Sequence, residues 1–181
     1  MYFGIVRSHG RSIMVLDMTS ILNGEVTVLN FDFSYVPEED GELRTVLWDI
    51  EFIEPIAVKG FVKNMAGYMT LEATAKVKYR TPCARCAEPV EKEAYVEVKK
   101  DIASSNVSHD NDDYIFIEDR KLDIVSPVEE QIMLEMPSKT LCREDCLGLC
   151  PKCGKNLNEG KCGCVTKTTD PRLEILKTLL K

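Results

Sequence analysis

Hydrophobic and polar residues alternate over much of residues 26–98, with the two-residue period that is typical of half-buried β-strands. The first clear stretch covers residues 26–35 and contains a one-residue slip near Leu29, which we interpret as a β-bulge. Its apolar positions are Val26, Val28, Phe31, Phe33 and Tyr35. The same pattern predicts further strands over residues 46–53, 56–62, 68–79, 90–98 and 114–117.

The connections between these segments are short. Residues 64–67, Asn-Met-Ala-Gly, are typical of a hairpin turn, and Pro55 separates two of the predicted strands. Parallel neighbours would need crossovers of about a dozen residues, so we expect an antiparallel sheet. Residues 103–113 are polar and acidic and predict a surface loop, in which His109 is a solvated histidine without a metal partner.

Two helix starts follow the strands. Ser126 as N-cap, Pro127 at the first position and Glu129 three after the cap predict a helix that ends at Pro137. A second helix is predicted after Asp170-Pro171, with an apolar stripe of Leu173, Leu176 and Leu180. The expected fold class is α+β: an antiparallel β-rich body, a cysteine-rich tail and a C-terminal helix.

The expected organisation has three parts. Residues 1–13 are unpatterned and predict a flexible extension, or a functional start at Met14; residues 14–136 form the body, and residues 137–181 form the zinc-binding tail with the C-terminal helix. No secretory signal is visible and no apolar stretch approaches the length of a membrane span. We therefore expect a cytoplasmic protein that does not associate with membranes.

Charge is distributed unevenly along the chain. The net charge of −7 excludes a generic nucleic-acid coat, but residues 137–181 carry nine Lys or Arg against five Asp or Glu. This basic tail points to an anionic partner, although a solvated basic face explains it equally well. The basic residues considered for such contacts are Lys139, Arg143, Lys152, Lys155, Lys161 and Lys167.

The eight cysteines form four close pairs, and in a reducing compartment such pairs indicate metal ligands before disulfides. Four thiolates suit tetrahedral zinc. The strongest predicted site is Cys150, Cys153, Cys162 and Cys164. The loop between its two halves, residues 154–161, is rich in turn formers and has little apolar surface, so metal binding is what could fold it.

A second zinc site is predicted by counting the remaining ligands. It would consist of Cys83, Cys86, Cys142 and Cys146. Other pairings, a single zinc ion with several free thiols, and an iron–sulfur cluster remain open. A redox dithiol is a further alternative, but Cys83 and Cys86 lie between two predicted strands rather than at a helix start. No catalytic constellation stands out, so we expect a protein that is not an enzyme.

The order of these features resembles the YceD family of large ribosomal RNA subunit accumulation proteins. The resemblance covers nearly the whole chain from Met14, and its tail resembles the Gram-positive branch. The matching segments are Leu16-Asp17, residues 21–24, Cys83-Ala84-Arg85-Cys86, residues 148–151, residues 156–158 and residues 170–173. Ala87 departs from the leucine that members typically have there, and some proteobacterial relatives keep only the central cysteine pair.

The resemblance implies a bacterial factor for accumulation of large-subunit ribosomal RNA. The first hypothesis is a non-enzymatic ribosome-biogenesis factor whose tail contacts ribosomal RNA or a pre-ribosomal particle. Aromatic residues for base stacking are absent from residues 137–181, so base-specific reading of a single strand is not expected. The second hypothesis is a zinc-stabilised adaptor that binds a large-subunit ribosomal protein or a nuclease without RNA contact. The third is a thiol oxidoreductase.

Overall fold

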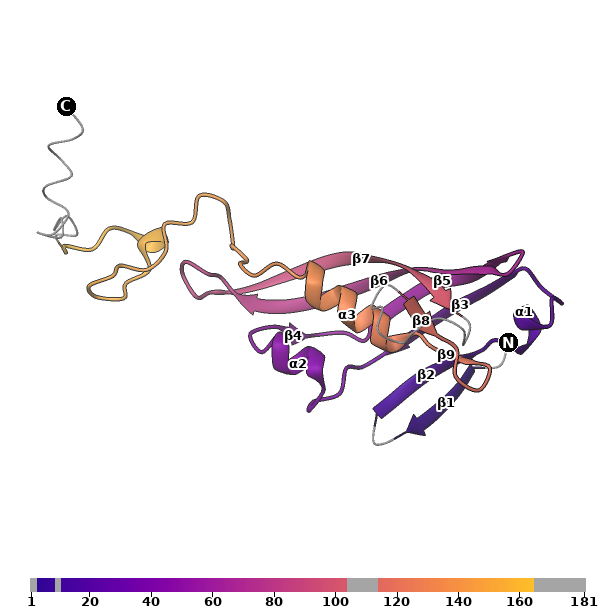
Figure 1. Cartoon of the computed structure of the whole chain (residues 1–181). Coiled ribbons are helices and arrows are strands. Elements are labelled where there is room, and N and C mark those ends of the chain that lie inside the picture. Colours follow the sequence, from indigo (N-terminus) through magenta and orange to yellow (C-terminus); the bar gives the residue numbers. More distant parts are fainter. Residues whose placement is uncertain (1–2, 9–10, 104–113, 165–181) are drawn as a thin grey trace, which may run out of the picture. The chain divides into compact units, whose positions relative to one another are not determined.

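The structure is a computed structural model of the chain, and it describes residues 3–8, 11–103 and 114–164 (Figure 1). The chain divides into two compact units. Unit 1 comprises residues 1–81 and 91–138, and unit 2 comprises residues 82–90 and 139–181. The second unit thus includes a short segment near the middle of the chain, whereas the sequence had placed the boundary of the tail at residue 137 alone.

A six-stranded sheet is the main element of unit 1, and Figure 1 draws four of its strands, β3, β5, β6 and β7, as long arrows. The strand order is β3 (Val28–Tyr35), β5 (Ile56–Met65), β6 (Tyr68–Pro82), β7 (Pro89–Ala103) and β8 (Tyr114–Phe116), with β4 (Glu51–Phe52) paired to β6. The pairs β3–β5, β5–β6 and β4–β6 are antiparallel, while β8 runs parallel to β7. The predicted α+β class with an antiparallel β-rich body is therefore confirmed.

The register of β3 shows where the interpretation of its pattern was wrong. Pairing with β5 continues without interruption from Val28 opposite Lys63 to Tyr35 opposite Ile56, so this strand has no bulge. Phe31 and Phe33 are buried, whereas the side chain of Val28 is 39% exposed. The apparent slip arises because Val26 and Val28 are both exposed, while the inward-facing series of β3 begins at Leu29.

The β5–β6 hairpin was predicted correctly. Met65 pairs with Tyr68, and the two residues between them, Ala66 and Gly67, have φ angles of 54° and 96°. Positive φ at both positions gives a turn whose twist matches the strands. The Gly67 N–H also donates a hydrogen bond of 2.9 Å to the Asn64 side chain.

Residues 46–53 do not form the predicted strand. Helix α2 (Glu42–Val46) ends at the first of them, and only the two-residue β4 lies among the rest. Leu43 is buried on the inner side of this short helix, while Val46 and Trp48 are exposed. A short apolar run fits either a helical turn or a strand, so the sequence pattern alone could not tell the two apart here.

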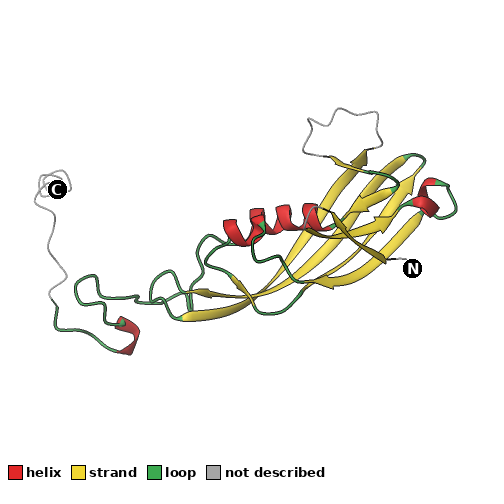
Figure 2. Cartoon of the chain, turned by 90° about the horizontal axis from the view of Figure 1, so that it is seen from below, coloured by secondary structure: helices red, strands yellow, loops and turns green. Residues whose placement is uncertain are grey.

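Helix α3 (Val125–Glu135) lies along one face of the sheet (Figures 1 and 2). Its Val128 and Ile132 side chains are fully buried in the same core as Val58 and Leu71 of the sheet. The helix begins one residue before the predicted cap, because Asp123 rather than Ser126 accepts the free N–H groups of its first turn. The predicted end before Pro137 is correct.

A second sheet of three strands contains the N-terminal part of the chain. Its order is β1 (Phe3–Ser8), β2 (Arg11–Asp17) and β9 (Lys121–Asp123), and both pairs are antiparallel. Residues 3–8 and 11–13 thus lie in strands, which differs from the flexible extension expected for residues 1–13. A short helix, α1 (Thr19–Leu22), follows β2, and the Thr19 N–H donates to Asp17.

Unit 2 contains little regular structure apart from the ends of β6 and β7 and a short 3-10 helix, η1 (Leu157–Glu159). The predicted C-terminal helix, Lys167 and His109 lie outside the described residues. Among the described helices, none is long and apolar enough to cross a membrane.

Candidate metal centres

Unit 2 brings all eight cysteines into two groups of four. We call Cys83, Cys86, Cys142 and Cys146 the hairpin cluster, because its first two members lie in the turn between β6 and β7. Within each group, the sulfur atoms lie within 4.8 Å of one another. In the hairpin cluster, Sγ of Cys83 is 3.9 Å from Sγ of Cys146, and Sγ of Cys86 is 3.7 Å from Sγ of Cys142.

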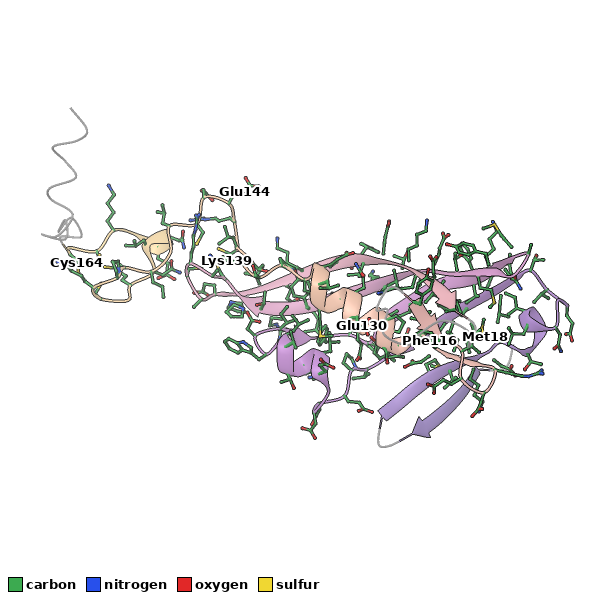
Figure 3. All side chains as sticks on the ribbon, in the orientation of Figure 1. Met18, Phe116, Glu130, Lys139, Glu144 and Cys164 are labelled. Carbon is green, nitrogen blue, oxygen red and sulfur yellow. The ribbon has the colours of Figure 1, made fainter. Side chains whose placement is uncertain are left out.

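The second group, which we call the tail cluster, consists of Cys150, Cys153, Cys162 and Cys164. These are the two sets that the sequence had predicted, including the pairing of residues 83 and 86 with residues 142 and 146. In Figure 3, the labels Lys139, Glu144 and Cys164 mark the segment that carries six of the eight cysteines, those from Cys142 to Cys164. Cys83, Cys86, Cys146 and Cys150 are buried, while Cys142 and Cys153 are exposed.

Both Cys-x-x-Cys segments fold into the same turn. The Cys83 N–H donates to the Glu88 carbonyl at 2.8 Å, and the Ala87 N–H donates to the Cys83 carbonyl at 2.9 Å. At the equivalent positions, the Cys150 N–H donates to the Lys155 carbonyl and the Gly154 N–H to the Cys150 carbonyl, both at 2.9 Å.

The residue after each second cysteine has a positive φ angle, which is 61° at Ala87 and 71° at Gly154. Glycine adopts this conformation freely, whereas alanine is strained in it. Gly154 therefore suits its position, and the sequence did not indicate that Ala87 adopts the same backbone conformation.

The shared turn favours a thiolate at the first cysteine. Backbone N–H groups of Arg85 and Cys86 lower the pKa of Cys83 to about 6, and those of Cys153 and Lys152 lower the pKa of Cys150 to about 6. Hydrogen bonds to a charged sulfur stabilise the charged form, and a thiolate is the form that binds metal.

Other members of the clusters resist ionisation. The hydrogen bond with Cys153, followed by burial, raises the pKa of Cys164 to about 12. Like charges at this separation disfavour one another, so four neighbouring thiols do not all ionise without a compensating cation. A divalent ion among the four sulfurs supplies that charge, and four thiolates form the donor set that zinc and iron–sulfur clusters accept.

Several residues outside the cysteines hold the hairpin cluster in place. Val90 and Leu141 pack with its buried members Cys83, Cys86 and Cys146. The Arg85 side chain donates to the Cys146 carbonyl at 2.8 Å, and its own carbonyl accepts from the Leu149 N–H at 3.0 Å. These contacts join the turn between β6 and β7 to the segment that carries Cys142 and Cys146.

Gly148 is required at a close approach between these two segments. Its φ angle is 73°, and a Cβ atom added to it would lie 2.9 Å from the Arg85 carbonyl oxygen. Any side chain would therefore meet both an unfavourable backbone conformation and a clash with backbone. In the sequence, Gly148 was recognised only as part of a family resemblance, without a structural role.

Asn158 is a further residue at the site whose role sequence reasoning missed. Its Nδ2 donates to Cys146 Sγ at 3.3 Å, and its Oδ1 accepts from the Leu147 N–H and from Arg143, both at 2.8 Å. Burial raises the pKa of Cys146, but the hydrogen bonds from Asn158 and from the Gly148 backbone outweigh burial, and the pKa is lowered. The sequence feature that could have indicated this role is the pair Asn156 and Asn158, which lies in the loop between Cys153 and Cys162.

The placement of the cysteines also bears on redox chemistry. Cys83 and Cys86 lie in a β-hairpin turn, and Cys150 and Cys153 lie in a loop, so neither pair is at the start of a helix. Thioredoxin-like dithiols depend on a helix N-terminus to stabilise their thiolate. In both pairs the backbone of the turn has that effect instead, and each pair faces a second pair of cysteines.

Comparison with known proteins gives a consistent assignment. The model of the family described as "Large ribosomal RNA subunit accumulation protein YceD" matches residues 71–180. Uncharacterized protein YlbN of Bacillus subtilis is 29% identical over 154 residues, which are 84% of this chain and 89% of that protein.

Shorter matches extend to other organisms. An uncharacterized protein of Mycobacterium bovis is 33% identical over 76 residues, so the match spans only 37% of that protein and 40% of this chain. A chloroplastic protein of Arabidopsis thaliana, named as a homolog of large ribosomal RNA subunit accumulation protein YCED, is 35% identical over 51 residues, or 28% of this chain and 16% of that protein. No solved structure matches.

Proposed function

The chain belongs to the YceD family of large ribosomal RNA subunit accumulation proteins, and from this premise we propose that it is a non-enzymatic, cytoplasmic factor of ribosome biogenesis. In this role it promotes accumulation of large-subunit ribosomal RNA. The observation that carries the proposal is the family match over residues 71–180, because that segment contains every cysteine of both clusters.

Zinc is the metal that fits the two clusters best. Each offers four sulfur donors and no nitrogen or oxygen ligand, and this donor set closes a tetrahedral zinc site without an open position for substrate. Such a closed site is structural. Because unit 2 has little regular structure, binding of two zinc ions is the main force that would hold its loops together.

The partner that we propose is ribosomal RNA or a pre-ribosomal particle. Lys152, Lys155 and Lys161 are exposed around the tail cluster and have no ion pair among those of the described residues. Lysines in this position can contact phosphate groups without reading bases. Their contribution is sequence-independent and weakens as salt rises.

One observation favours the second candidate, a protein-binding adaptor. A zinc ion with four thiolates carries a formal charge of minus two, so two such centres cancel the four excess positive charges of residues 137–181. A neutral tail has less attraction for RNA than the sequence suggests. The exposed Leu147 and Leu149, which lie beside Cys146 and Cys150, would then contact a large-subunit ribosomal protein.

Depletion of the protein in a bacterium that encodes it tests the proposed function. Large-subunit ribosomal RNA should fall relative to small-subunit RNA and should recover when the wild-type chain is supplied. An unchanged ratio after complete depletion would contradict the proposal. Crosslinking in the same cells separates the two candidates, because RNA joined to unit 2 supports direct contact, whereas crosslinks to protein alone support the adaptor.

A further inference from the structure

Asn158 belongs to one cysteine cluster by its place in the chain and to the other by its contacts. It lies in η1, between Cys153 and Cys162, inside the segment that the tail cluster closes. Its side chain instead contacts residues 143–147, the segment that carries Cys146 of the hairpin cluster.

The orientation of the Asn158 amide follows from its partners. The Leu147 N–H can only donate, so the atom that it meets at 2.8 Å must be the oxygen Oδ1. The nitrogen Nδ2 is thereby directed at two acceptors, Cys146 Sγ at 3.3 Å and Asn156 Oδ1 at 2.8 Å. All the hydrogen bonds of this amide are mutually consistent, and an N–H group therefore faces the sulfur.

The tail-cluster segment fixes the position of Asn158. The Asn156 side chain accepts a hydrogen bond from the Asn158 N–H at 3.1 Å, and Asn156 forms a β-bridge with Leu149. The Leu157 N–H donates to the Gly148 carbonyl at 2.9 Å. A metal ion on the tail cluster would close this loop and hold these contacts in register.

The two clusters differ in how far they reach along the chain. The tail cluster lies within residues 150–164, whereas Cys86 and Cys142 of the hairpin cluster are 56 positions apart. The tail cluster can form from one short segment by itself, whereas the hairpin cluster needs residues 142–146 to be brought to the turn between β6 and β7. The tail cluster is therefore the one expected to bind metal first, and the hairpin cluster follows.

We propose that Asn158 couples metal binding at the two cysteine clusters, so that a metal ion on the tail cluster increases the affinity of the hairpin cluster. This rests on the proposal that both clusters hold zinc. The physical link is the N–H···S contact to Cys146, a hydrogen bond to a ligand atom that orients the ligand and stabilises its negative charge. By thermodynamic linkage, metal on the hairpin cluster strengthens binding at the tail cluster by the same factor.

The test uses the full chain, stripped of metal under reducing conditions and titrated with Zn²⁺ while native mass spectrometry counts the ions bound. The wild-type chain should pass from zero to two ions with little one-ion species. In Asn158→Ala the one-ion species should accumulate, and hairpin-cluster affinity should fall by about 10- to 100-fold, the usual effect of losing such a partner. Co²⁺ absorption, read separately in variants that retain one cluster, assigns the affinity to its cluster.

Two further variants sharpen the comparison. Asn158→Asp keeps the oxygen that accepts from Leu147 but replaces the N–H facing Cys146, so it should weaken the hairpin cluster while the tail cluster still binds. Glu159→Ala is the matched control, since Glu159 is the next residue of η1 and its side chain makes no hydrogen bond or ion pair among the described residues. Its titration should follow the wild type.

A cycle of variants isolates the coupling. Cys153→Ser with Cys162→Ser removes the tail cluster and should weaken the hairpin cluster in the wild-type background but have no further effect when Asn158 is already alanine. Independent filling of two sites in the wild type, or an equal loss in both backgrounds, overturns the coupling alone. A wild-type chain that binds fewer than two ions overturns the zinc proposal and the coupling together.

Discussion

The side-chain nitrogen of Asn158 lies 3.3 Å from the sulfur of Cys146, although the two residues belong to different cysteine clusters along the chain. Together with the contact between Leu149 and Arg85, this places both clusters in one hydrogen-bonded unit. A substitution at one cluster should therefore affect the other, and the following predictions use residues whose effects can be separated.

Substitutions at Ala87 and Gly154, the residues that follow the two Cys-x-x-Cys segments, should change the stability of unit 2 in opposite directions. Gly154→Ala places a side chain where φ is +71°, with no atom within 4 Å of the new Cβ, so the loss should be close to the conformational cost of about 1 kcal/mol. Ala87→Gly removes the same strain and should stabilise unit 2. The gain should be only roughly 0.5 kcal/mol, because glycine loses more conformational entropy on folding than alanine does, and this offsets part of the relief. The measurement is the denaturant concentration at which zinc is released to a colorimetric indicator.

Gly148→Ala should be more damaging than Gly154→Ala. Both residues have positive φ, but only at Gly148 would the new Cβ lie 2.9 Å from a backbone oxygen of Arg85. Relief of that clash requires movement of backbone in the hairpin cluster, which adds about 1–3 kcal/mol to the conformational cost. Zinc release at distinctly lower denaturant than in Gly154→Ala is expected, and equal midpoints would argue against the close approach.

In the metal-free protein, the thiols of Cys83 and Cys150 should lose their protons at much lower pH than those of Cys142 and Cys164. Because the pKa values of Cys83 and Cys150 are lowered from 9.0 to about 6, their thiolates stabilise the folded unit fully above pH 9. That stabilisation declines as pH falls from 9 and is lost below about pH 6. Thiolate absorbance near 240 nm should show a first step close to pH 6, and absence of any thiolate below pH 8 contradicts the turn geometry.

Alkylation tests the redox alternative. In zinc-loaded protein, Cys83 and Cys86 should resist iodoacetamide, because they are buried and would be ligands, and a chelator should make them reactive. Exposed Cys153 is an internal comparison, since its protection would come from metal and not from burial. Rapid modification of Cys83 in the zinc-loaded chain would instead support a thiol oxidoreductase.

Much of the sheet could be predicted because its inward positions alternate strictly, as Leu71, Ala73, Ala75 and Val77 do in β6. The prediction failed where few residues carry the pattern. Residues 42–53 bury little more than Leu43 and Ile50, so a helical turn and a strand remained equally compatible with their sequence. The first residue of α3 is Val125, two before the predicted Pro127, because Asp123 accepts hydrogen bonds from the N–H groups of Val125 and Ser126.

The cysteine sets could be predicted because four-ligand sites leave few pairings once Cys150, Cys153, Cys162 and Cys164 are grouped. The residues around them could not. Arg85, Gly148 and Asn158 act through contacts between segments far apart in the chain, and only the fold brings Arg85 to Cys146. A single side-chain hydrogen bond between distant segments produces no repeating pattern in the sequence, so such contacts could not be predicted from it.

The most direct test of the account is the number of zinc ions bound by the full chain, measured by native mass spectrometry after expression in zinc-supplemented medium. Two ions per chain are predicted, with one ion lost when Cys83 and Cys86 are replaced by serine. A wild-type chain that binds no zinc would contradict the two four-cysteine centres. So would a wild-type chain that binds one ion and still binds it when Cys83 and Cys86 are replaced.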